Sequence, residues 1–342
     1  MRVVVAMDKF RGTVTAREAC AAVANACWEL GLDADEAPMS DGGEGLLEVL
    51  GGANRTAVVT GPLGIPVEAA WRLEAKTAVI EMARASGLTL AGGADGNDPL
   101  QATTRGTGEL IERALEHGAR TVIVGLGGSA TTDGGLGALE ALRSPNRLRS
   151  VDVQVACDVR TRFVDAAAVF APQKGASPAQ VALLTASLEG LAARYLDMYG
   201  VDVTELERSG AAGGLAGGLA ALGATLVGGF ELVAEHVELD TRLAAADVVV
   251  TGEGFLDAQS LDGKVVGGVL DAAGEHAVPV IVLVGDADAV VRDAVAARAS
   301  VLTLVERDGE HRAMTEPRTC LERAAADGLR AAAAGSVSRS SR

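Results

Sequence analysis

The sequence TVIVGLGGSATTDGGLG, residues 121–137, joins a short apolar run to a loop that is dense in glycine. The apolar run is typical of a buried strand, and a structural turn after it needs only one or two glycines. A denser loop lets backbone N–H groups approach a small anion closely. Gly127, Gly128, Ser129 and Thr131 are therefore candidates for cradling a phosphate, and Asp133 beside them suits a metal-bridged phosphate.

The same alternation of strand and helix extends to both ends of the chain. RVVVA at 2–6 precedes a helix that a Thr15–Glu18 capping box begins, and ADVVVTGEG, VPVIVLVGD and VLTLV alternate with helices near the other end. The middle is richer in glycine and contains strands of antiparallel character. We therefore predict an α/β protein with two domains. One is a discontinuous Rossmann-like parallel-sheet domain, 1–75 plus 245–330, and the other is an inserted α/β domain with a mixed sheet, 76–244, followed by a disordered tail at 331–342.

The composition excludes several classes of function. The 342 residues are 49% hydrophobic, which suits two domains, and the formal net charge is −16. So acidic a surface argues against nucleic acid or an anionic membrane as a partner. The four cysteines lack CxxC spacing, and the four histidines lack metal or triad spacing. With no signal or membrane-span pattern, a cytoplasmic location is expected.

Several carboxylates follow predicted strands directly, namely Asp8, Asp41, Asp158 and Glu253. In open parallel sheets, ligands bind at this edge. Each acid could instead cap the helix that follows it. The sequence MDKFRGT adds Lys9, which could hold a phosphate or a carboxylate. The sequence SDGGEG adds Glu44, and Asp41 together with Glu44 could hold Mg²⁺ or accept a hydroxyl proton.

Two further segments carry polar side chains in a suggestive order. VFAPQKGASP places Lys174 before a helix, where it could contact an anion or simply lie on the surface. TGEGFLDAQSLDGK could form a polar wall from Asp257, Ser260 and Lys264 with the glutamate already named, although its spacing is not that of a P-loop. The loop after TVIV also matches the dinucleotide pattern GxGxxA at 125–130, which alone is a weak signal.

The combined motifs resemble the bacterial glycerate kinase family. DKFRGT, SDGGEG, NDPLQATTRGTGELI, GLGGSATTDGG, VACDV, FAPQKGAS, GAAGGL and TGEGFLDAQSLDGK occur in the family's order over about residues 1–290. The resemblance implies ATP-dependent phosphorylation of D-glycerate, usually to 2-phosphoglycerate, with Mg²⁺, in organic-acid and glyoxylate carbon metabolism. It also implies two α/β domains with the active site in the cleft between them; a homodimer is left open.

On this resemblance, the candidate residues take roles in phosphoryl transfer. Asp8 or Asp41 would be the base toward the glycerate hydroxyl, and Lys9, with Lys174 as a weaker candidate, would neutralise negative charge. The other assignments are cofactor binding by Gly127, Gly128, Ser129, Thr131, Ser260 and Lys264, substrate binding by Glu44, Arg105 and Asp158, and Mg²⁺ binding by Asp133, Glu253 and Asp257.

The chain departs from the family pattern at two places. Only RSPNRLRS, residues 143–150, stands where members have a longer hairpin-like stretch, and RTRFVDAA at 160–167 replaces the usual sequence after VACDV. Two other functions remain open. A nicotinamide-dependent dehydrogenase would use GxGxxA but lacks the expected acid about 20 residues further on, and a non-catalytic metabolite sensor would keep the cleft without turnover.

Overall fold

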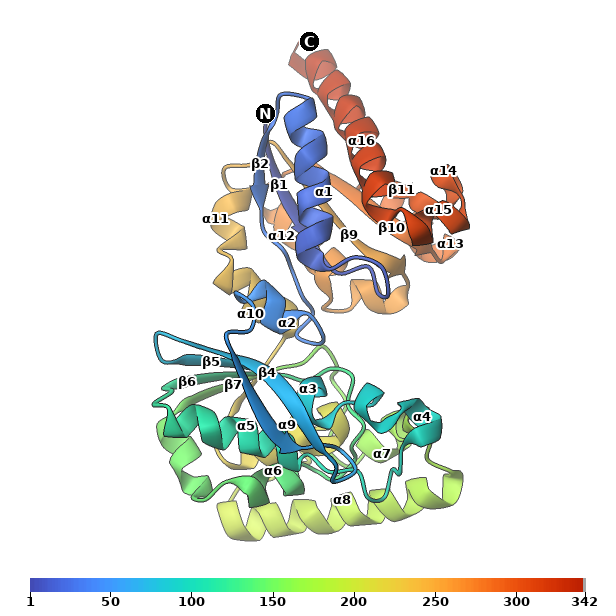
Figure 1. Ribbon diagram of the computed structural model, residues 1–342. Helices are drawn as coiled ribbons and strands as arrows, with labels where there is room; N and C mark the ends of the chain where they lie inside the picture. Colours follow the sequence, from blue (N-terminus) through green and yellow to red (C-terminus); the bar gives the residue numbers. More distant parts are fainter. Residues whose placement is uncertain (341–342) are drawn as a thin grey trace. The chain divides into compact units, whose positions relative to one another are not determined.

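The computed structural model describes residues 1–340, which form two compact units, each with its own β-sheet (Figure 1). Unit 1 comprises Met1–Asp41 and the chain from Phe230 onward, and unit 2 comprises Gly42–Gly229. The α/β class, the discontinuous first domain and the inserted second one are as predicted. No helix among residues 1–340 is long and apolar enough to span a membrane.

Unit 1 is a doubly wound α/β unit. Its elements are β1 (Arg2–Met7), α1 (Ala16–Glu29), β2 (Asp33–Glu36), α10 (Gly229–His236), α11 (Leu239–Leu243), β9 (Val248–Leu256), η5 (Ala258–Leu261), α12 (Val265–Glu275), β10 (Val280–Ala287), α13 (Ala289–Ala296), β11 (Ser300–Thr303), α14 (Leu304–Asp308), α15 (Glu310–Thr315) and α16 (Pro317–Ser340). The five strands are all parallel, in the order β11-β10-β9-β1-β2. This is the flavodoxin-like order, which has its switch point between β1 and β9.

The core of unit 1 follows from strands that are apolar on both faces. Val3 and Val5 of β1 pack with α1 and α16, which lie side by side over the sheet in Figure 1. Val4, which lies on the opposite face of β1, is also fully buried. Helix α12 packs against β9 and β10. The predicted capping box of Thr15 and Glu18 begins α1, which typically stabilises a helix by about 1 kcal/mol.

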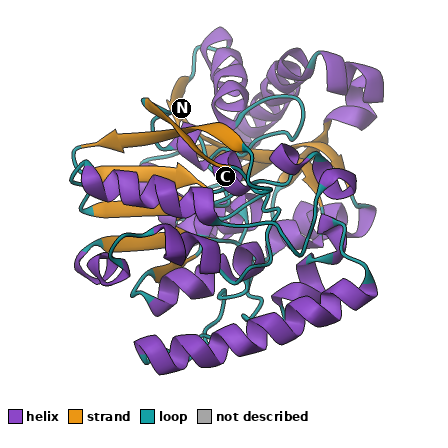
Figure 2. Cartoon of the chain, turned by 60° about the horizontal axis from the view of Figure 1, so that its bottom comes forward, coloured by secondary structure: helices purple, strands orange, loops and turns teal. Residues whose placement is uncertain are grey.

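Unit 2 contains a mixed sheet. Its elements are α2 (Leu46–Val49), β3 (Arg55–Thr60), β4 (Pro66–Glu74), β5 (Thr77–Glu81), α3 (Ala83–Ser86), η1 (Thr89–Ala91), α4 (Gly93–Gly96), α5 (Arg105–Glu116), β6 (Thr121–Gly125), α6 (Leu136–Ala141), η2 (Pro145–Ser150), β7 (Asp152–Ala156), α7 (Ala166–Phe170), η3 (Pro172–Lys174), α8 (Pro178–Tyr199), η4 (Ala211–Gly214), α9 (Leu215–Ala221) and β8 (Thr225–Val227). The strand order is β3-β4-β5-β6-β7-β8; β3, β4 and β5 pair antiparallel, and β5 to β8 pair parallel. The long helix α8 runs along the outside of this unit (Figure 1; Figure 2).

The domain boundaries differ from the expected ones at both ends of the insertion. Residues 42–75, expected in the first domain, belong to unit 2 because β3 and β4 form antiparallel pairs that continue through β5. Residues 230–244, expected in the insert, belong to unit 1. The predicted tail differs as well: α16 continues to Ser340, so 331–340 are helical, while 341 and 342 lie outside the described residues.

Candidate active site

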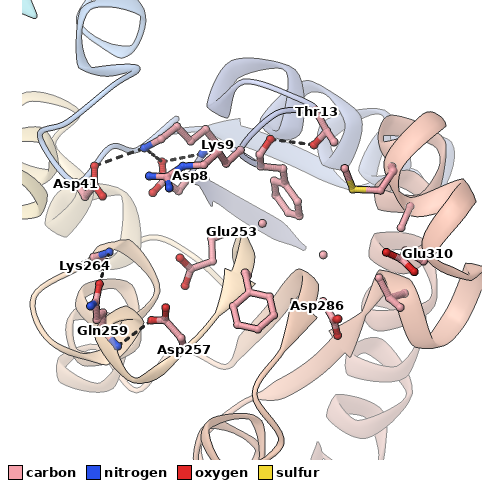
Figure 3. Close-up of a pocket in the computed structure, with 18 residues that line it drawn as sticks. Asp8, Lys9, Thr13, Asp41, Glu253, Asp257, Gln259, Lys264, Asp286 and Glu310 are labelled. Carbon is pink, nitrogen blue, oxygen red and sulfur yellow. Dashed lines mark hydrogen bonds and ion pairs between the residues drawn. The ribbon is translucent and has the colours of Figure 1, made fainter. Parts of the chain in front are cut away.

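A pocket of about 440 Å³ lies in unit 1, where β1, β9 and β10 end (Figure 3). Its position agrees with the rule that open α/β sheets bind ligands beyond the carboxyl ends of the strands, at the switch point. The structure brings together six of the predicted site residues in its lining: Asp8, Lys9, Asp41, Glu253, Asp257 and Lys264.

Lys9 lies between two carboxylates at one side of this pocket. Its Nζ is 3.5 Å from Asp41 Oδ1 and 3.8 Å from Asp8 Oδ1, and its backbone N–H donates to the same Asp8 oxygen at 2.7 Å. Burial acts to lower the pKa of Lys9, but the two carboxylates outweigh it and the pKa is raised. Lys9 is therefore a firmly charged cation within the pocket.

Asp8 is the buried carboxylate of this group. Burial raises its pKa to about 6, the charge of Lys9 opposes that shift, and the carboxylate of Asp41 adds to it. A carboxylate with a pKa just below neutral can accept a proton from a hydroxyl and still be ionised at pH 7. Asp8 is therefore a candidate general base.

Glu253, on β9, is the second carboxylate with a displaced pKa. Burial raises its pKa to about 7, the Ser260 hydroxyl opposes the shift, and Asp8 adds to it. Its Oε1 is buried without a hydrogen-bond partner among the described residues. A buried, unpaired oxygen is costly, so Glu253 is the site's clearest candidate to receive a cation or a ligand proton.

Asp257 and Ser260 have a local structural role beside the pocket. Asp257 Oδ1 accepts hydrogen bonds from the backbone of Gln259 at 2.8 Å and Ser260 at 3.1 Å, so it caps η5. Lys264 is the N-cap residue of α12, and its Nζ is 3.5 Å from Gln259 Oε1. The cap orders the segment that carries Lys264 to the pocket, where Figure 3 shows it opposite Asp8 and Lys9.

The donor set of this pocket suits Mg²⁺ better than it suits a soft metal. No group of three or more His, Cys, Asp or Glu in the described part of the chain could by itself hold a metal ion. Mg²⁺ commonly uses only one or two carboxylates and takes its other ligands from phosphate and water. Glu253 with its unpaired oxygen and the neighbouring Asp257 meet that requirement.

The other predicted residues, apart from Ser260, belong to unit 2, where the glycine loop is packed against backbone. A Cβ on Gly127 would lie 2.6 Å from Gly43 Cα, and one on Gly125 would lie 2.7 Å from Gly42 O. Gly128 has a φ of +64°, which favours glycine. The density of glycine therefore has a steric cause. The helix that follows begins only at Leu136, so the GxGxxA match at 125–130 is not a dinucleotide-binding turn.

Lys174 is buried in unit 2, with 3% of its surface exposed. Its Nζ donates to Thr131 O at 2.6 Å, and Thr131 Oγ1 lies 3.0 Å from Ser129 Oγ. Burial lowers the pKa of Lys174 to about 7, against the attraction of Asp133. Of the two positions considered for Lys174, an anion contact or the surface, the surface one is wrong, because its amine is buried and bound to the glycine loop.

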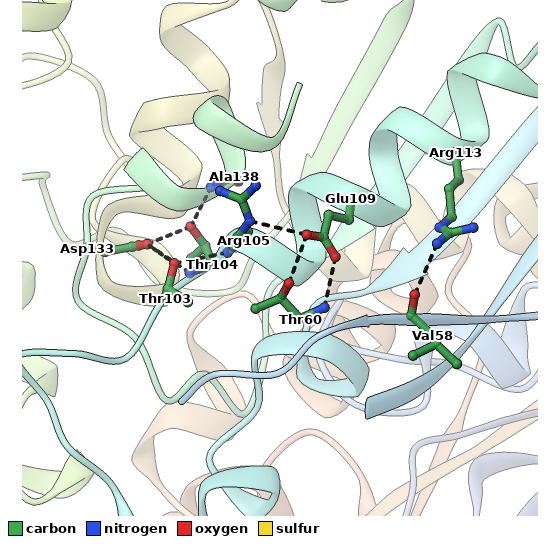
Figure 4. A network of polar contacts seen from close by, with 9 residues as sticks. All are labelled: Val58, Thr60, Thr103, Thr104, Arg105, Glu109, Arg113, Asp133 and Ala138. Atoms are coloured by element: carbon green, nitrogen blue, oxygen red, sulfur yellow. Dashed lines mark hydrogen bonds and ion pairs between the residues drawn. The ribbon is translucent and has the colours of Figure 1, made fainter. Parts of the chain in front are cut away.

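Asp133 joins the starts of two helices in unit 2 (Figure 4). Its Oδ2 accepts from Thr104 N and Thr104 Oγ1, both at 2.8 Å, and from Gly137 N at 3.2 Å, while Oδ1 accepts from Gly135 N at 3.1 Å. These bonds occupy Oδ2 fully and give the residue a structural role. Burial raises its pKa, and the hydrogen bonds oppose that shift. Its predicted role as a Mg²⁺ ligand stays a prediction that its hydrogen bonding does not favour.

The three predicted substrate-binding residues lie at separate places in unit 2. Arg105 begins α5 and pairs with Glu109 at 3.3 Å, Asp158 follows β7, and Glu44 is exposed in the loop before α2. That loop is ordered by Glu81, which the sequence analysis missed. Glu81 accepts from Gly45 N at 2.9 Å and from Leu47 N at 2.8 Å. The sequence feature that could have identified Glu81 is its position at the end of the apolar strand TAVIE.

The sequence analysis also missed one end of the unit 1 pocket. Phe255, Asp286, Glu310 and Met314 line it, contributed by β9, β10 and α15. Phe255 and Asp286 are neighbours across the β9–β10 pairing. The sequence signals were an aromatic residue inside TGEGFLD and an acid after VPVIVLVG, but α15 could not be assigned to the pocket without the fold.

The fold and this pocket define a doubly wound α/β enzyme in which carboxylates and lysines meet at the strand ends. The family model described as the glycerate kinase family matches residues 3–145 and 142–333. The chain therefore belongs to the glycerate kinase family, as its motifs indicated. The two matched segments overlap at residues 142–145, where RSPNRLRS begins and the sequence departs from the family pattern.

Individual relatives agree over nearly the whole chain. Glycerate 2-kinase of Escherichia coli K12 is 39% identical over 349 positions, covering 89% of this chain and 91% of its own. Glycerate kinase of Bacillus subtilis 168 is 37% identical over 372 positions, covering 95% and 97%. A crystal structure from Salmonella typhimurium LT2, whose description names glycerate kinase 2, is 32% identical with a TM-score of 0.81, covering 99% of each chain.

Proposed function

We propose that this protein transfers the γ-phosphoryl group of ATP to D-glycerate, giving 2-phosphoglycerate and ADP, within organic-acid and glyoxylate carbon metabolism. Membership in the glycerate kinase family supports the acceptor. The observation that carries the chemistry is the buried carboxylate of Asp8 beside the amine of Lys9 in a pocket at the strand ends. The 2-position follows the relative from Escherichia coli, which is named glycerate 2-kinase.

In this proposal Asp8 is the general base. The glycerate hydroxyl oxygen attacks the γ-phosphorus, its proton passes to an Asp8 oxygen, and the bond from phosphorus to the bridging oxygen of ADP breaks. Since phosphoryl transfer needs alignment and charge neutralisation more than covalent help, Lys9 and Lys264 would balance the negative charge of the phosphates and the glycerate carboxylate. Asp41 holds the Lys9 amine toward this position at 3.5 Å.

Mg²⁺ is the cation proposed for this site, with Glu253 and Asp257 as its protein ligands. It would shield the charge of the phosphates during transfer. The roles predicted for the glycine loop (Gly127, Gly128, Ser129 and Thr131) and for Lys174, Asp158, Arg105 and Glu44 remain proposals for the same reaction. A cytoplasmic location and a homodimer likewise stay predictions.

The deciding experiment mixes the purified protein with MgATP and D-glycerate, follows ADP release, and identifies the product by ³¹P and ¹³C NMR. We expect ADP and 2-phosphoglycerate in equal amounts. Formation of 3-phosphoglycerate would correct the position but keep the kinase. ATP binding without turnover would favour a metabolite sensor, and NADH binding without ATP binding would favour a dehydrogenase.

A further inference from the structure

One end of the unit 1 pocket is apolar and open to solvent. Phe255 and Met314 line it with 52% and 58% of their surfaces exposed. Phenylalanine is scarce in this chain, with five in 342 residues, and two of them, Phe10 and Phe255, line this pocket. Val305 and Ala313 complete the apolar surface. Large apolar side chains that are exposed within a concave site typically mark where a ligand packs.

Two of the residues that line the pocket, Gly254 and Gly285, contribute only backbone to it. A Cβ on Gly254 would lie 3.1 Å from Arg11 N, and one on Gly285 would lie 2.4 Å from Gly254 O. Both glycines line the pocket, where β9 and β10 end beside the loop that follows β1. A side chain at Gly285 would displace the neighbouring strand. Glycine at these two positions thus has a steric cause, and it leaves backbone as the surface that a ligand meets there.

The two lysines of the pocket lie at one end of it. Lys9 and Lys264 lie among the carboxylates near Asp8, whereas Asp286 and Glu310 lie toward the other end, as Figure 3 shows; Arg11 also lines the pocket. The carboxylates of Asp286 and Glu310 are exposed acceptors close to Phe255 and Met314 in the lining. A ligand that spans the pocket would therefore have a negatively charged group at the lysine end. At the other end it would have hydroxyl donors for the two carboxylates and a planar apolar group.

The volume of the pocket also indicates a ligand larger than glycerate. Glycerate is far smaller than a pocket of about 440 Å³, which lies within the roughly 300–1,000 Å³ range of sites for larger organic ligands. If glycerate and the transferred phosphoryl group occupy the side near Asp8 and Lys9, the rest of the pocket is available to the phosphoryl donor. The donor's phosphates would then lie toward Lys9 and Lys264.

We propose that Phe255 and Met314 form the binding site for the base of the nucleoside triphosphate, with Asp286 and Glu310 accepting hydrogen bonds from its ribose hydroxyls. This assignment rests on the proposed kinase function and adds the orientation of the donor in unit 1. The base packs on the Phe255 ring and the Met314 side chain above the backbone of Gly254 and Gly285. Because stacking grows with the size of the ring system, purine nucleotides are preferred over pyrimidine nucleotides.

The test compares Phe255→Ala and Met314→Ala with wild-type protein by calorimetric titration of MgADP and, separately, of inorganic tripolyphosphate. We expect Phe255→Ala to weaken MgADP binding about tenfold, in line with the loss of one base–aromatic stack. Tripolyphosphate binding should change less than twofold, because it has no base. Phe255→Trp, which keeps an aromatic ring, should bind MgADP as tightly as the wild type does. Val290→Ala, which truncates a side chain with 79% of its surface exposed in the same unit, is the matched control.

Two outcomes would separate this assignment from the kinase proposal. Wild-type protein that phosphorylates glycerate, with MgADP affinity unchanged in Phe255→Ala and Met314→Ala, would overturn the base site alone. Equal weakening of MgADP and tripolyphosphate would also overturn it, since the side chains would then act on the phosphates or on the fold. Wild-type protein that neither binds MgADP nor phosphorylates glycerate would overturn the kinase proposal and the base site with it.

Discussion

The amine of Lys9 lies 3.5 Å from Asp41 Oδ1, an ion pair that joins the loop after β1 to the last residue of the first segment of unit 1. The same amine is 3.8 Å from Asp8 Oδ1. One cation thus holds two carboxylates that would otherwise repel each other. This arrangement makes the roles of Asp8 and Asp41 separable by experiment.

Asp8→Asn should lower the turnover of glycerate by about 10² to 10⁴, the range that loss of a general base produces. MgADP affinity should stay within a few-fold of wild type, because the proposed role is in proton transfer. The measurement is kcat by coupled ADP release, with Asp293→Asn, an exposed carboxylate on α13, as the control. Turnover within a few-fold of wild type in both Asp8→Asn and Asp41→Asn would remove both residues as the base.

The pH profile should report the carboxyl group of Asp8. Its pKa is about 6, so kcat/KM should fall as the pH drops through about 6 and the base becomes protonated. Asp41→Asn removes a carboxylate that raises the pKa of Asp8, so the acid limb of the residual activity should move to lower pH. A limb that moves upward in Asp41→Asn would contradict this assignment.

Glu253→Gln should stabilise the protein at pH 8 while lowering its activity. Burial raises the pKa of Glu253 from 4.5 to about 7, so the folded state binds more protons than the unfolded state between these values. The stability it contributes is therefore complete below pH 4.5 and is lost as the pH rises through about 7. Thermal unfolding at pH 4.5 and pH 8 checks this, and the gain in Tm should appear at pH 8 only. The exposed carboxylate of Glu275 provides the control, Glu275→Gln, with no such gain.

The substitution Lys174→Met tests whether the amine of Lys174 has a structural or a catalytic role. Burial lowers the pKa of Lys174 from 10.5 to about 7, so stability falls as the pH decreases from 10.5 toward about 7. The substitution should therefore raise Tm more at pH 6 than at pH 9. Full turnover in this variant would remove Lys174 from the proposed catalytic residues, whereas lost turnover in a stabilised variant would keep it there.

Much of the fold could be predicted from local sequence. The capping box at Thr15 and the β–α alternation at both ends each depend on a short-range pattern, and each has its counterpart in the structure. The domain boundary near 75 was wrong because the pattern of β3 and β4 shows that they are strands, not which sheet they join. That choice depends on the pairing of β4 with β5.

The rule that ligands bind beyond strand ends found part of the candidate site. Asp8, Asp41 and Glu253 were chosen by it and line one pocket, whereas Asp158, chosen by the same rule, lies in unit 2. Met314 could not be found, because α15 reaches the pocket through tertiary packing that no spacing encodes. The glycine loop, in contrast, was chosen from the sequence although its glycines also have a steric explanation. Its glycines at 125 and 127 pack against backbone from residues 42 and 43, so a steric requirement and a phosphate cradle have the same appearance in sequence.

The insertion of unit 2 between Asp41 and Phe230 has a consequence for synthesis on the ribosome. Strand β1 pairs with β9, and Val3 is matched to Val248, so the amino-terminal strand is made long before its neighbour. The entire inserted unit emerges first and can complete its own sheet, as domains generally fold in order of emergence. The apolar segment RVVVAM must meanwhile wait without its central partner strand. Strand β2 can pair with one edge of β1 early, but the other edge stays unpaired until β9 is made, and an unpaired apolar strand edge favours aggregation during translation.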